Sequence, residues 1–503
     1  MNIRSIPWQR VILGLLALVV VSVSAWGAEL RLVLLHTNDL HDHVRAGDSR
    51  LGGLPYVAGY VRQVRAEGAA VLLLDAGDVT EKGDLVAFRT EGVMTYEAMR
   101  RIGYDGVTVG NHDFDEVSPD WIRRFEAALG QSLLCLNIVQ PDGRPVFAPS
   151  RVVERGGLRI ALIGMIVPRE ASKGGLDFKE SGAALAREAK RLRAVSDLVV
   201  AVCHQGVPKC VEWSRAAPDV DVFVSGHSHQ ALPEPVVVPD TGAIVVQAGK
   251  YAQWVGRLDL VISTEPRRVV RHAGRLVPMD HGKIEPDAAM LAWVSEREAA
   301  LAPEAGQRLG DNPAELDGFA VARLGAEALR QAAQAEIGFC HPYQVIRDVL
   351  PAGRVDVNAV FKAGGDRGRE VVVAELTGAE VEAYVNALVS VQREPPEWTG
   401  FRVQRAPVPG GGERWSTDLE AKRRYRVVLP KIEWETRLLR LADQLRARDP
   451  ANPLAARTLV AAKVEVNFTD ATVAYLREVI AAGDTWPRRA EALVKQREGG
   501  RAP

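Results

Sequence analysis

The stretch LLHTNDLHDH (34–43) ends a short apolar run with a cluster of histidines and aspartates. Four further apolar runs in the first half of the chain end in the same way, at DAGD (75–78), GNHDFD (110–115), CHQG (203–206) and SGHSH (225–229). The runs are short, rich in Val and Leu and bounded by turn residues, which is typical of buried strands. Because the carboxyl ends of strands in an open α/β sheet share one crevice, we expect the polar clusters to meet there. The sequence therefore predicts a metal site.

The polar residues of these segments are ligand types of a catalytic rather than a structural metal site. Carboxylate, amide and imidazole ligands without a thiolate suit Mn²⁺, Zn²⁺, Fe or Co. The candidate ligands number seven, too many for one ion: Asp39, His41, Asp78, Asn111, His204, His227 and His229. We expect two ions that share a bridging carboxylate, and Asp78, on its tight Gly-Asp turn, is the natural bridge. Such a pair clamps the attacking and leaving oxygens of a displacement at phosphorus.

The first residues have the order of a secretory signal. Arg4 and Arg10 precede an apolar run (11–23), and small residues follow up to Ala28. The run is short for a membrane span, so we expect a cleaved signal peptide (1–28) and a secreted or periplasmic protein. A retained N-terminal anchor is the alternative. No second apolar run in the sequence is long enough to cross a bilayer, so we expect no membrane span after removal of the signal.

Charge and cysteine content exclude some classes of partner and fold. The 63 Lys and Arg residues nearly balance the 64 Asp and Glu residues, so neither a nucleic acid polymer nor an anionic membrane surface is expected as a partner. Four cysteines are too few for a disulfide scaffold. Cys203 and Cys210 flank the loop after His204 and either pair in an oxidising compartment or are separate, with Cys203 a small buried residue. Cys135 and Cys340 are expected in the core.

The length of 503 residues suits two domains. Strands and helical stretches alternate from Leu30 to about Val261, a pattern that indicates a largely parallel sheet. After a polar helical connector, a second unit begins near Leu309 with further helices and strands. The predicted order is a signal peptide (1–28), an α/β domain (29–270), a linker with a helix (271–308) and a second, α+β domain (309–503).

The motifs of the first domain follow one another in the order and approximate spacing of a known family. On LLHTNDLHDH, LDAGD, GNHDFD, VCHQG, GHSH and VQAGKYAQWVGRLDL (246–260), the region 30–262 resembles the calcineurin-like metallophosphoesterases, and among them the secreted 5′-nucleotidases. The resemblance implies an N-terminal α/β/β/α sandwich followed by an α+β substrate domain. It also implies an exported phosphoesterase that uses two divalent metal ions on a small-molecule phosphate ester, such as a nucleotide.

The resemblance also implies a role for each matching residue. One ion would bind Asp39, His41, Asp78 and His229, and the second Asp78, Asn111, His204 and His227. His112 and Asp115 would form a catalytic dyad, in which His112 stabilises the transferring phosphoryl group or the leaving oxygen and Asp115 orients its ring. A metal-bound hydroxide would be the nucleophile. The remaining polar residues of these motifs do not match ligand positions: we expect His36 to be structural, His43 to lie behind the ligands or in solvent, and Asp42 and Asp113 to serve in loops and packing.

The second domain resembles the substrate domain of the family more weakly. Where the family has an Asn, two glycines and an Arg around the substrate phosphate, this chain has HPYQVIR (341–347), in which only Arg347 matches. Where the family has a Phe and a Gly-Gly-Asp-Gly-Tyr stretch, this chain has PKIEWETRLL (430–439). Arg347 is therefore either a substrate contact or a surface salt bridge. Three aromatic residues either stack on a planar substrate group or pack in the core: Trp398, Phe401 and Trp434.

Three functions fit the sequence. The first is an exported dimetal phosphomonoesterase, acting on substrates such as nucleotides. The second keeps the dimetal chemistry but changes the ester to a cyclic phosphodiester, a nucleotide sugar or a thiosulfo group. The third is a non-catalytic binding protein on the same fold, which the complete ligand set disfavours because converging buried polar residues are costly. The GNHDFD segment disfavours the thiosulfo substrate.

Overall fold

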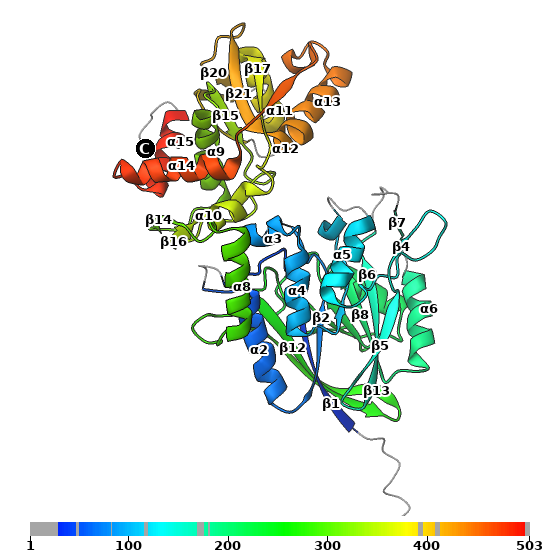
Figure 1. Cartoon of the computed structure of the whole chain (residues 1–503). Coiled ribbons are helices and arrows are strands. Elements are labelled where there is room, and N and C mark those ends of the chain that lie inside the picture. Colours follow the sequence, from blue (N-terminus) through cyan, green and yellow to red (C-terminus); the bar gives the residue numbers. More distant parts are fainter. Residues whose placement is uncertain are drawn as a thin grey trace, which may run out of the picture. The chain divides into compact units, whose positions relative to one another are not determined.

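The computed structural model describes residues 29–46, 50–81, 83–114, 119–168, 176–179, 182–390, 396–407 and 413–497 (Figure 1). The predicted signal peptide and Asp115 lie outside these residues. The chain divides into two compact units. Among the described residues, the first unit holds 29–46, 50–81 and those between Gly92 and Leu291, and the second holds 83–91 and those from Ala292 onward. The later boundary falls inside helix α8 (Ala288–Leu301), within the segment predicted as a linker.

One sheet of the first unit carries the first three predicted strands. Its order is β13-β12-β1-β2-β3, with β1, β2 and β3 parallel to one another and β12 and β13 antiparallel to their neighbours. The strands are β1 (Glu29–Thr37), β2 (Ala70–Asp75), β3 (Gly106–Val107), β12 (Trp254–Thr264) and β13 (Arg267–Pro278). Residues 271–278, placed in the linker by the sequence, thus belong to this sheet. Helices α2 (Leu54–Ala66), α4 (Val93–Ile102) and α5 (Pro119–Leu129) come from the same part of the chain.

The last two predicted strands lie in a second sheet of order β10-β11-β9-β8-β6-β5. The inner strands β6, β8, β9 and β11 are parallel, whereas β5 and β10 are antiparallel edges. The strands are β5 (Ser150–Arg155), β6 (Leu158–Ile166), β8 (Leu198–His204), β9 (Val222–Ser225), β10 (Val236–Val237) and β11 (Ile244–Val246). Helices α6 (Gly182–Arg193) and α7 (Val207–Ala216) cover its outer face. A small separate pair consists of β4 (Ile138–Val139) and β7 (Asp177–Phe178).

The two sheets pack face to face. Leu34 and Leu72 of the first sheet share one buried cluster with Leu162 and Val200 of the second. Helices α2 and α4 lie on one side of the sheets and α6 on the other (Figure 1). The α/β/β/α sandwich implied by the resemblance is thereby confirmed. The single open sheet expected from the strand pattern alone was wrong, because an apolar run marks a buried strand without specifying which sheet it joins.

The second unit has one five-stranded sheet of order β18-β15-β21-β17-β22. Its strands are β15 (Ile337–Cys340), β17 (Val371–Thr377), β18 (Glu397–Thr399), β21 (Arg424–Pro430) and β22 (Ala461–Val464). Two small antiparallel pairs accompany it: β14 (Arg308–Asn312) with β16 (Gly353–Asp356), and β19 (Val403–Pro407) with β20 (Glu413–Thr417). The helical segments are α3 (Leu85–Arg89), α9 (Gly318–Ala332), α10 (Val357–Val360), α11 (Gly378–Ser390), α12 (Lys431–Glu433), α13 (Arg440–Arg448), α14 (Phe468–Ala481) and α15 (Trp486–Arg497).

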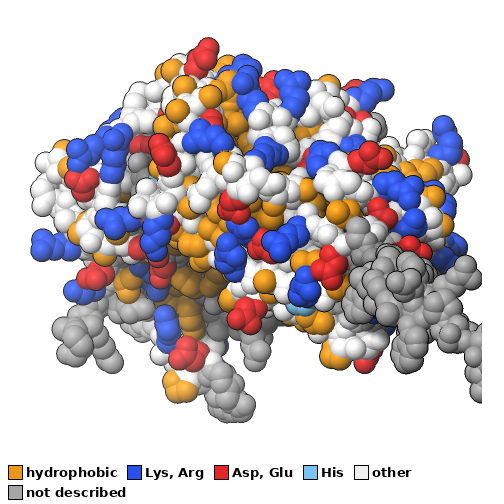
Figure 2. All heavy atoms as spheres, turned by 90° about the horizontal axis from the view of Figure 1, so that it is seen from below, with side chains coloured by type: hydrophobic (Ala, Val, Ile, Leu, Met, Phe, Trp, Pro, Cys, Tyr) orange, Lys and Arg blue, Asp and Glu red, His pale blue; other side chains and the backbone are white. Residues whose placement is uncertain are grey.

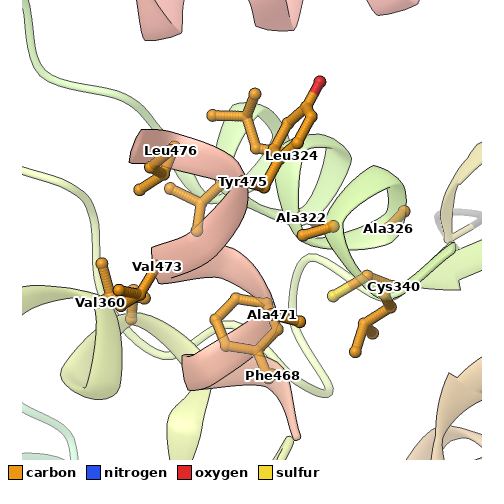
Figure 3. Close-up of a cluster of buried hydrophobic side chains, with 14 of the residues drawn as sticks. Ala322, Leu324, Ala326, Cys340, Val360, Phe468, Ala471, Val473, Tyr475 and Leu476 are labelled. Atoms are coloured by element: carbon orange, nitrogen blue, oxygen red, sulfur yellow. The ribbon is translucent and has the colours of Figure 1, made fainter. Parts of the chain in front are cut away.

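The core of the second unit is split by its sheet. On one face, α9 and α14 bury residues such as Leu324, Phe468 and Leu476 (Figure 3). The Asp317 and Asn467 side chains cap these two helices by accepting hydrogen bonds from backbone N–H groups of the first turn. The other face buries three aromatic residues whose role the sequence left open: Trp398, Phe401 and Trp434. All three residues pack in this core, and Trp398 and Phe401 also border a cavity, so stacking on a substrate group stays a prediction.

The surface charge, the cysteines and the helices can each be compared with what the sequence predicted. Figure 2 shows acidic and basic side chains interspersed over the face that it presents. All four cysteines lie among the described residues as buried free thiols, so Cys203 and Cys210 form no disulfide. None of the helices that the described residues form has both the length and the apolar character needed to cross a membrane.

One carboxyl group of the second unit has a pKa that burial shifts. Glu433, at the end of α12, is fully buried and accepts a hydrogen bond from the Tyr384 hydroxyl at 3.2 Å. Burial raises the pKa of this carboxyl to about 8. The side chain is therefore neutral in the folded protein at neutral pH.

Replacing Glu433 with Gln should remove a pH dependence of stability. Between its ordinary pKa of 4.5 and the folded pKa of about 8, the folded protein holds a proton that the unfolded chain releases, so the free energy of unfolding falls as pH rises through this window. Gln keeps an acceptor for Tyr384 and never ionises. Urea denaturation should show Glu433→Gln gaining stability relative to wild type from pH ~5 to pH ~9. The exposed neighbour Glu435→Gln is the control, and parallel pH profiles of Glu433→Gln and wild type would contradict the assignment.

Candidate metal centre

Most of the predicted ligands have backbone φ angles that are rare for residues other than glycine. Five of them have positive φ: Asp39 (52°), His41 (46°), Asp78 (54°), His227 (77°) and His229 (54°). A non-glycine residue in this region costs about 1–3 kcal/mol and persists only where its surroundings hold it, typically at functional sites. The loops after the strands are therefore shaped to aim these side chains.

Backbone hydrogen bonds join the strand-end loops in pairs. The Asp39 N–H donates to Gly77 O at 2.9 Å and the His41 N–H donates to Asp78 O at 3.0 Å, which ties the loop after β1 to the loop after β2. The Gly206 N–H donates to Gly226 O at 2.9 Å, which ties the loops after β8 and β9. A further bond joins the two sheets, from the His227 N–H to Asp39 Oδ2 at 3.1 Å. The carboxyl ends of both sheets thus converge on one place.

The first group of candidate ligands is Asp39, His41 and His229, whose ligand atoms lie within 4.8 Å of one another. His229 Nε2 is 3.2 Å from Asp39 Oδ1 and also 3.2 Å from His41 Nε2. His41 Nδ1 lies 3.2 Å from Thr80 O, and since a carbonyl only accepts, Nδ1 carries the proton and Nε2 presents its lone pair. Two imidazole nitrogens and a carboxylate oxygen so arranged fit a divalent cation.

The second group is Asp78, His204 and His227, again with ligand atoms within 4.8 Å of one another. His204 Nε2 is 3.1 Å from Asp78 Oδ2, and His227 Nδ1 is 2.8 Å from Asn111 Oδ1. The His204 Nδ1–H donates to Ala76 O at 2.7 Å, which turns Nε2 toward Asp78. Asp78 Oδ2 is also 3.8 Å from His41 Nε2 in the first group. Asp78 therefore lies between the two groups, as a bridging carboxylate would.

Charge balance in this cluster depends on Asp78. Burial opposes its ionisation, but the positive charge of His204 and its hydrogen bond to the carboxylate outweigh burial and hold the pKa of the Asp78 carboxyl well below its usual range. Burial also opposes a charge on His204, yet Asp78 raises the pKa of that ring to about 9. A cation that binds here replaces this proton, so metal loading of the group should release protons.

Two residues that brace the ligands were not identified as such from the sequence. Asp113 accepts hydrogen bonds from the N–H groups of Asp78 at 3.1 Å and Gly110 at 2.8 Å, and so joins the loops after β2 and β3. Asn38 donates to Asp39 Oδ2 at 2.6 Å and accepts from the Ala248 N–H at 2.7 Å. The sequence placed Asp113 in a loop or packing role, and the only signal for Asn38 was that it adjoins a ligand.

The remaining histidines of the motifs occupy distinct places. His112 begins a 3₁₀ turn (His112–Phe114), its N–H donates to Asp78 Oδ1 at 2.8 Å, and its ring centroid is 5.3 Å from that of His41. Its Nδ1 forms an ion pair with Glu81, a residue that the sequence did not single out. The His43 ring stacks on Tyr251 with centroids 4.0 Å apart. His36 lies in the core of the sheet, where burial lowers its pKa to about 3.

Two predicted site residues are not joined to this cluster by any described contact. Asp115 lies outside the described residues, so the dyad with His112 stays a prediction. Arg347 belongs to the second unit, where its N–H donates to Ala363 O at 2.7 Å. Its contact with substrate also stays a prediction.

Known proteins resemble this chain in sequence and in fold. Residues 32–231 match the family described as Calcineurin-like phosphoesterase. The endonuclease YhcR of Bacillus subtilis is 23% identical over 403 residues, which cover 71% of this chain but only 33% of that protein. The 5′-nucleotidase of Vibrio cholerae is 26% identical over 459 residues, which cover 77% of this chain and 81% of that protein.

Solved structures share the two-unit fold. The 5′-nucleotidase precursor of Thermus thermophilus matches with a TM-score of 0.67 at 21% identity, over 90% of this chain and 97% of that one. The sulfate thiohydrolase SoxB of the same bacterium matches with a TM-score of 0.64 at 17% identity, over 89% and 94%. At these identities the likeness establishes the fold. Residues 32–231 therefore form a calcineurin-like phosphoesterase domain, and the chain is a phosphoester hydrolase that is similar to the 5′-nucleotidases in sequence and in fold.

Proposed function

We propose that the protein is an exported phosphomonoesterase that hydrolyses small phosphate esters, such as nucleotides, with two divalent metal ions. The observation that carries the proposal is the position of Asp78 between two ligand groups, 3.1 Å from His204 and 3.8 Å from His41. Export is supported by the composition of residues 1–28, which has the order of a secretory signal.

The donor set suits ions such as Mn²⁺, Zn²⁺, Fe or Co, because it combines carboxylates, imidazoles and one amide without a thiolate. One ion would be held by Asp39, His41, Asp78 and His229, and the other by Asp78, Asn111, His204 and His227. When bound, such ions polarise phosphoryl oxygens and lower the pKa of water. The protein contributes the fixed spacing of the ligands and the orientation of His204 and His41 through the carbonyls of Ala76 and Thr80.

His112 is proposed to act on the ester itself. Its backbone is anchored on Asp78 and its ring lies beside His41, so the side chain borders the first ligand group. An imidazolium in this place would neutralise charge on the transferring phosphoryl group or give a proton to the leaving oxygen. Asp115 is proposed to orient the ring, and Arg347 to bind the part of the substrate that does not react.

A hydrolysis screen of the native protein with Mn²⁺ tests this function. The panel is nucleoside monophosphates, a sugar phosphate, a cyclic nucleotide, a nucleotide sugar, an S-sulfo thiol and single-stranded DNA. The readout is chromatographic separation of the organic products, together with release of phosphate from the monoesters and of sulfate from the S-sulfo thiol. We expect the monoesters to be hydrolysed fastest. A faster reaction on a diester, a nucleotide sugar or the thiosulfo compound would change the substrate class, and full metal loading without any turnover would indicate a binding protein.

Replacing His112 with Asn should separate binding from chemistry. The variant should keep its metal ions and lose turnover by about 10²-fold or more, the scale of a missing acid or electrostatic stabiliser. Metal content and kcat on the best monoester of the screen measure the two effects. The exposed His272→Ala is the control, and near-normal kcat in His112→Asn would reject the proposed role.

The bridging role of Asp78 predicts unequal metal loss in two variants. Asp78→Asn should lower the occupancy of both ions, because the carboxylate belongs to both ligand sets, whereas His41→Ala should mainly lower one. Elemental analysis of the purified proteins gives the ions per chain. His272→Ala, on the outer strand β13, should bind as wild type does. Two ions retained in Asp78→Asn would rule out the bridge.

Arg347 should matter for the natural substrate more than for a small ester. If its guanidinium binds the non-reacting part of the substrate, Arg347→Ala raises KM or lowers kcat/KM for a nucleotide and leaves a small chromogenic ester nearly unaffected. The exposed Arg354→Ala, from the same unit, is the matched control. Kinetics on both esters decide the question: an equal loss on both would show that Arg347 supports the fold.

A further inference from the structure

Glu81 forms an ion pair with the proposed catalytic histidine, from Oε2 of Glu81 to Nδ1 of His112. The two side chains are only 14% and 20% exposed, so solvent and salt screen this pair far less than a surface salt bridge. Both residues belong to the first unit. The Glu81 carboxylate therefore lies at Nδ1 of the His112 ring within that unit.

Hydrogen bonds hold Glu81 and the residue before it. The Glu81 N–H donates to Asp42 Oδ2 at 2.7 Å, and Glu81 itself has a positive φ of 72°. Its neighbour Thr80 donates through N–H and Oγ1 to Asp113 Oδ1, at 3.0 and 2.9 Å. Because Asp113 directly follows His112, two separate links join the same pair of loops. The Glu81 carboxylate is thus presented from a braced segment, as a positioning group requires.

A carboxylate at Nδ1 has a definite effect on an imidazole. It fixes the tautomer that carries a proton on Nδ1, stabilises the imidazolium and fixes the direction of Nε2 on the other side of the ring. The His112 ring lies against the first ligand group, with its centroid 5.3 Å from that of His41. We propose that Glu81 is a positioning residue that holds His112 with Nε2 toward the reacting phosphate ester. This inference rests on the proposed function, because it supports the role given there to His112.

Glu81 and Asp115 are then two carboxylates that are both proposed to orient the His112 ring. The orienting role of Asp115 comes from the resemblance to a family, whereas that of Glu81 comes from its contact with Nδ1. The two assignments predict different outcomes for isosteric amide variants. Glu81→Gln should impair His112, and Asp115→Asn should then have the smaller effect.

The experiment measures kcat, KM, metal content and melting temperature of the full chain, with Mn²⁺ and the best monoester of the screen. Glu81→Gln should keep both ions, its melting temperature and its KM while kcat falls about 10–100-fold, the scale for loss of a carboxylate that orients a histidine. In the His112→Asn background the same change should cost nothing further, because Glu81 acts only through that ring. Glu81→Asp, which keeps the charge on a shorter side chain, should fall between native and Glu81→Gln. The control is Glu212→Gln, whose carboxylate is 63% exposed and pairs with Lys209 on the surface.

Several outcomes would overturn the positioning role. If both Glu81 variants bound fewer metal ions or had a lower melting temperature, Glu81 would have a structural role instead. An equal further loss in the His112→Asn background would separate Glu81 from His112, and an unaffected Glu81→Gln beside an impaired Asp115→Asn would give the orienting role to Asp115. These results require an active native protein, whereas a native protein that hydrolyses no ester would overturn the proposed function instead.

Discussion

The first unit is organised around the burial of one ionised carboxylate. Asp78 is 1% exposed, and an ion that is removed from water to this extent is costly unless opposite charge surrounds it. His204 supplies that charge from the end of β8, where its loop begins, and His41 lies 3.8 Å away on the loop after β1. The backbone of a third loop reaches the carboxylate through the His112 N–H. Because these loops follow strands of both sheets, the charge can be balanced only where the carboxyl ends of the two sheets come together.

The convergence of these loops strains their backbone and brings the loop after β3 very close to Asp78. The positive φ angles at the ligands each cost about 1–3 kcal/mol, so the surrounding sandwich must over-determine the loops. Its sheets do so through a continuous apolar interface and the hydrogen bonds of Asp113 and Asn38. Gly110 is part of the same constraint, because a Cβ at this position would lie 2.1 Å from Asp78 Oδ1. The loop after β3 can reach the centre only with glycine at this position.

The sequence predicted the local elements and the convergence well, but not their partners. Runs such as 31–35 and 198–202 identify buried strands, yet the choice between one sheet and two depends on long-range packing that an apolar pattern does not encode. The family resemblance supplied the sandwich. Glu81 was missed for a similar reason: it lies outside the recognised motifs, and its relation to His112 exists only after the two loops fold together. The role of Trp398 could not be predicted, because the sequence around an aromatic residue does not show whether it packs in a core or lines a binding site.

The second unit keeps the fold of its structural neighbours while its sequence differs from the family motifs. In the segment that replaces the family's phosphate motif, His341 is buried and its Nδ1 accepts hydrogen bonds from the N–H groups of Tyr343 and Gln344 at 3.1 and 3.3 Å, so it caps its own turn. In the second altered segment, Glu433 and Trp434 point into the core. These side chains already have structural partners and would have to leave them to reach a substrate. Structural partners therefore account for these three side chains, while the metal-ligand motifs of the first unit keep the pattern of the family.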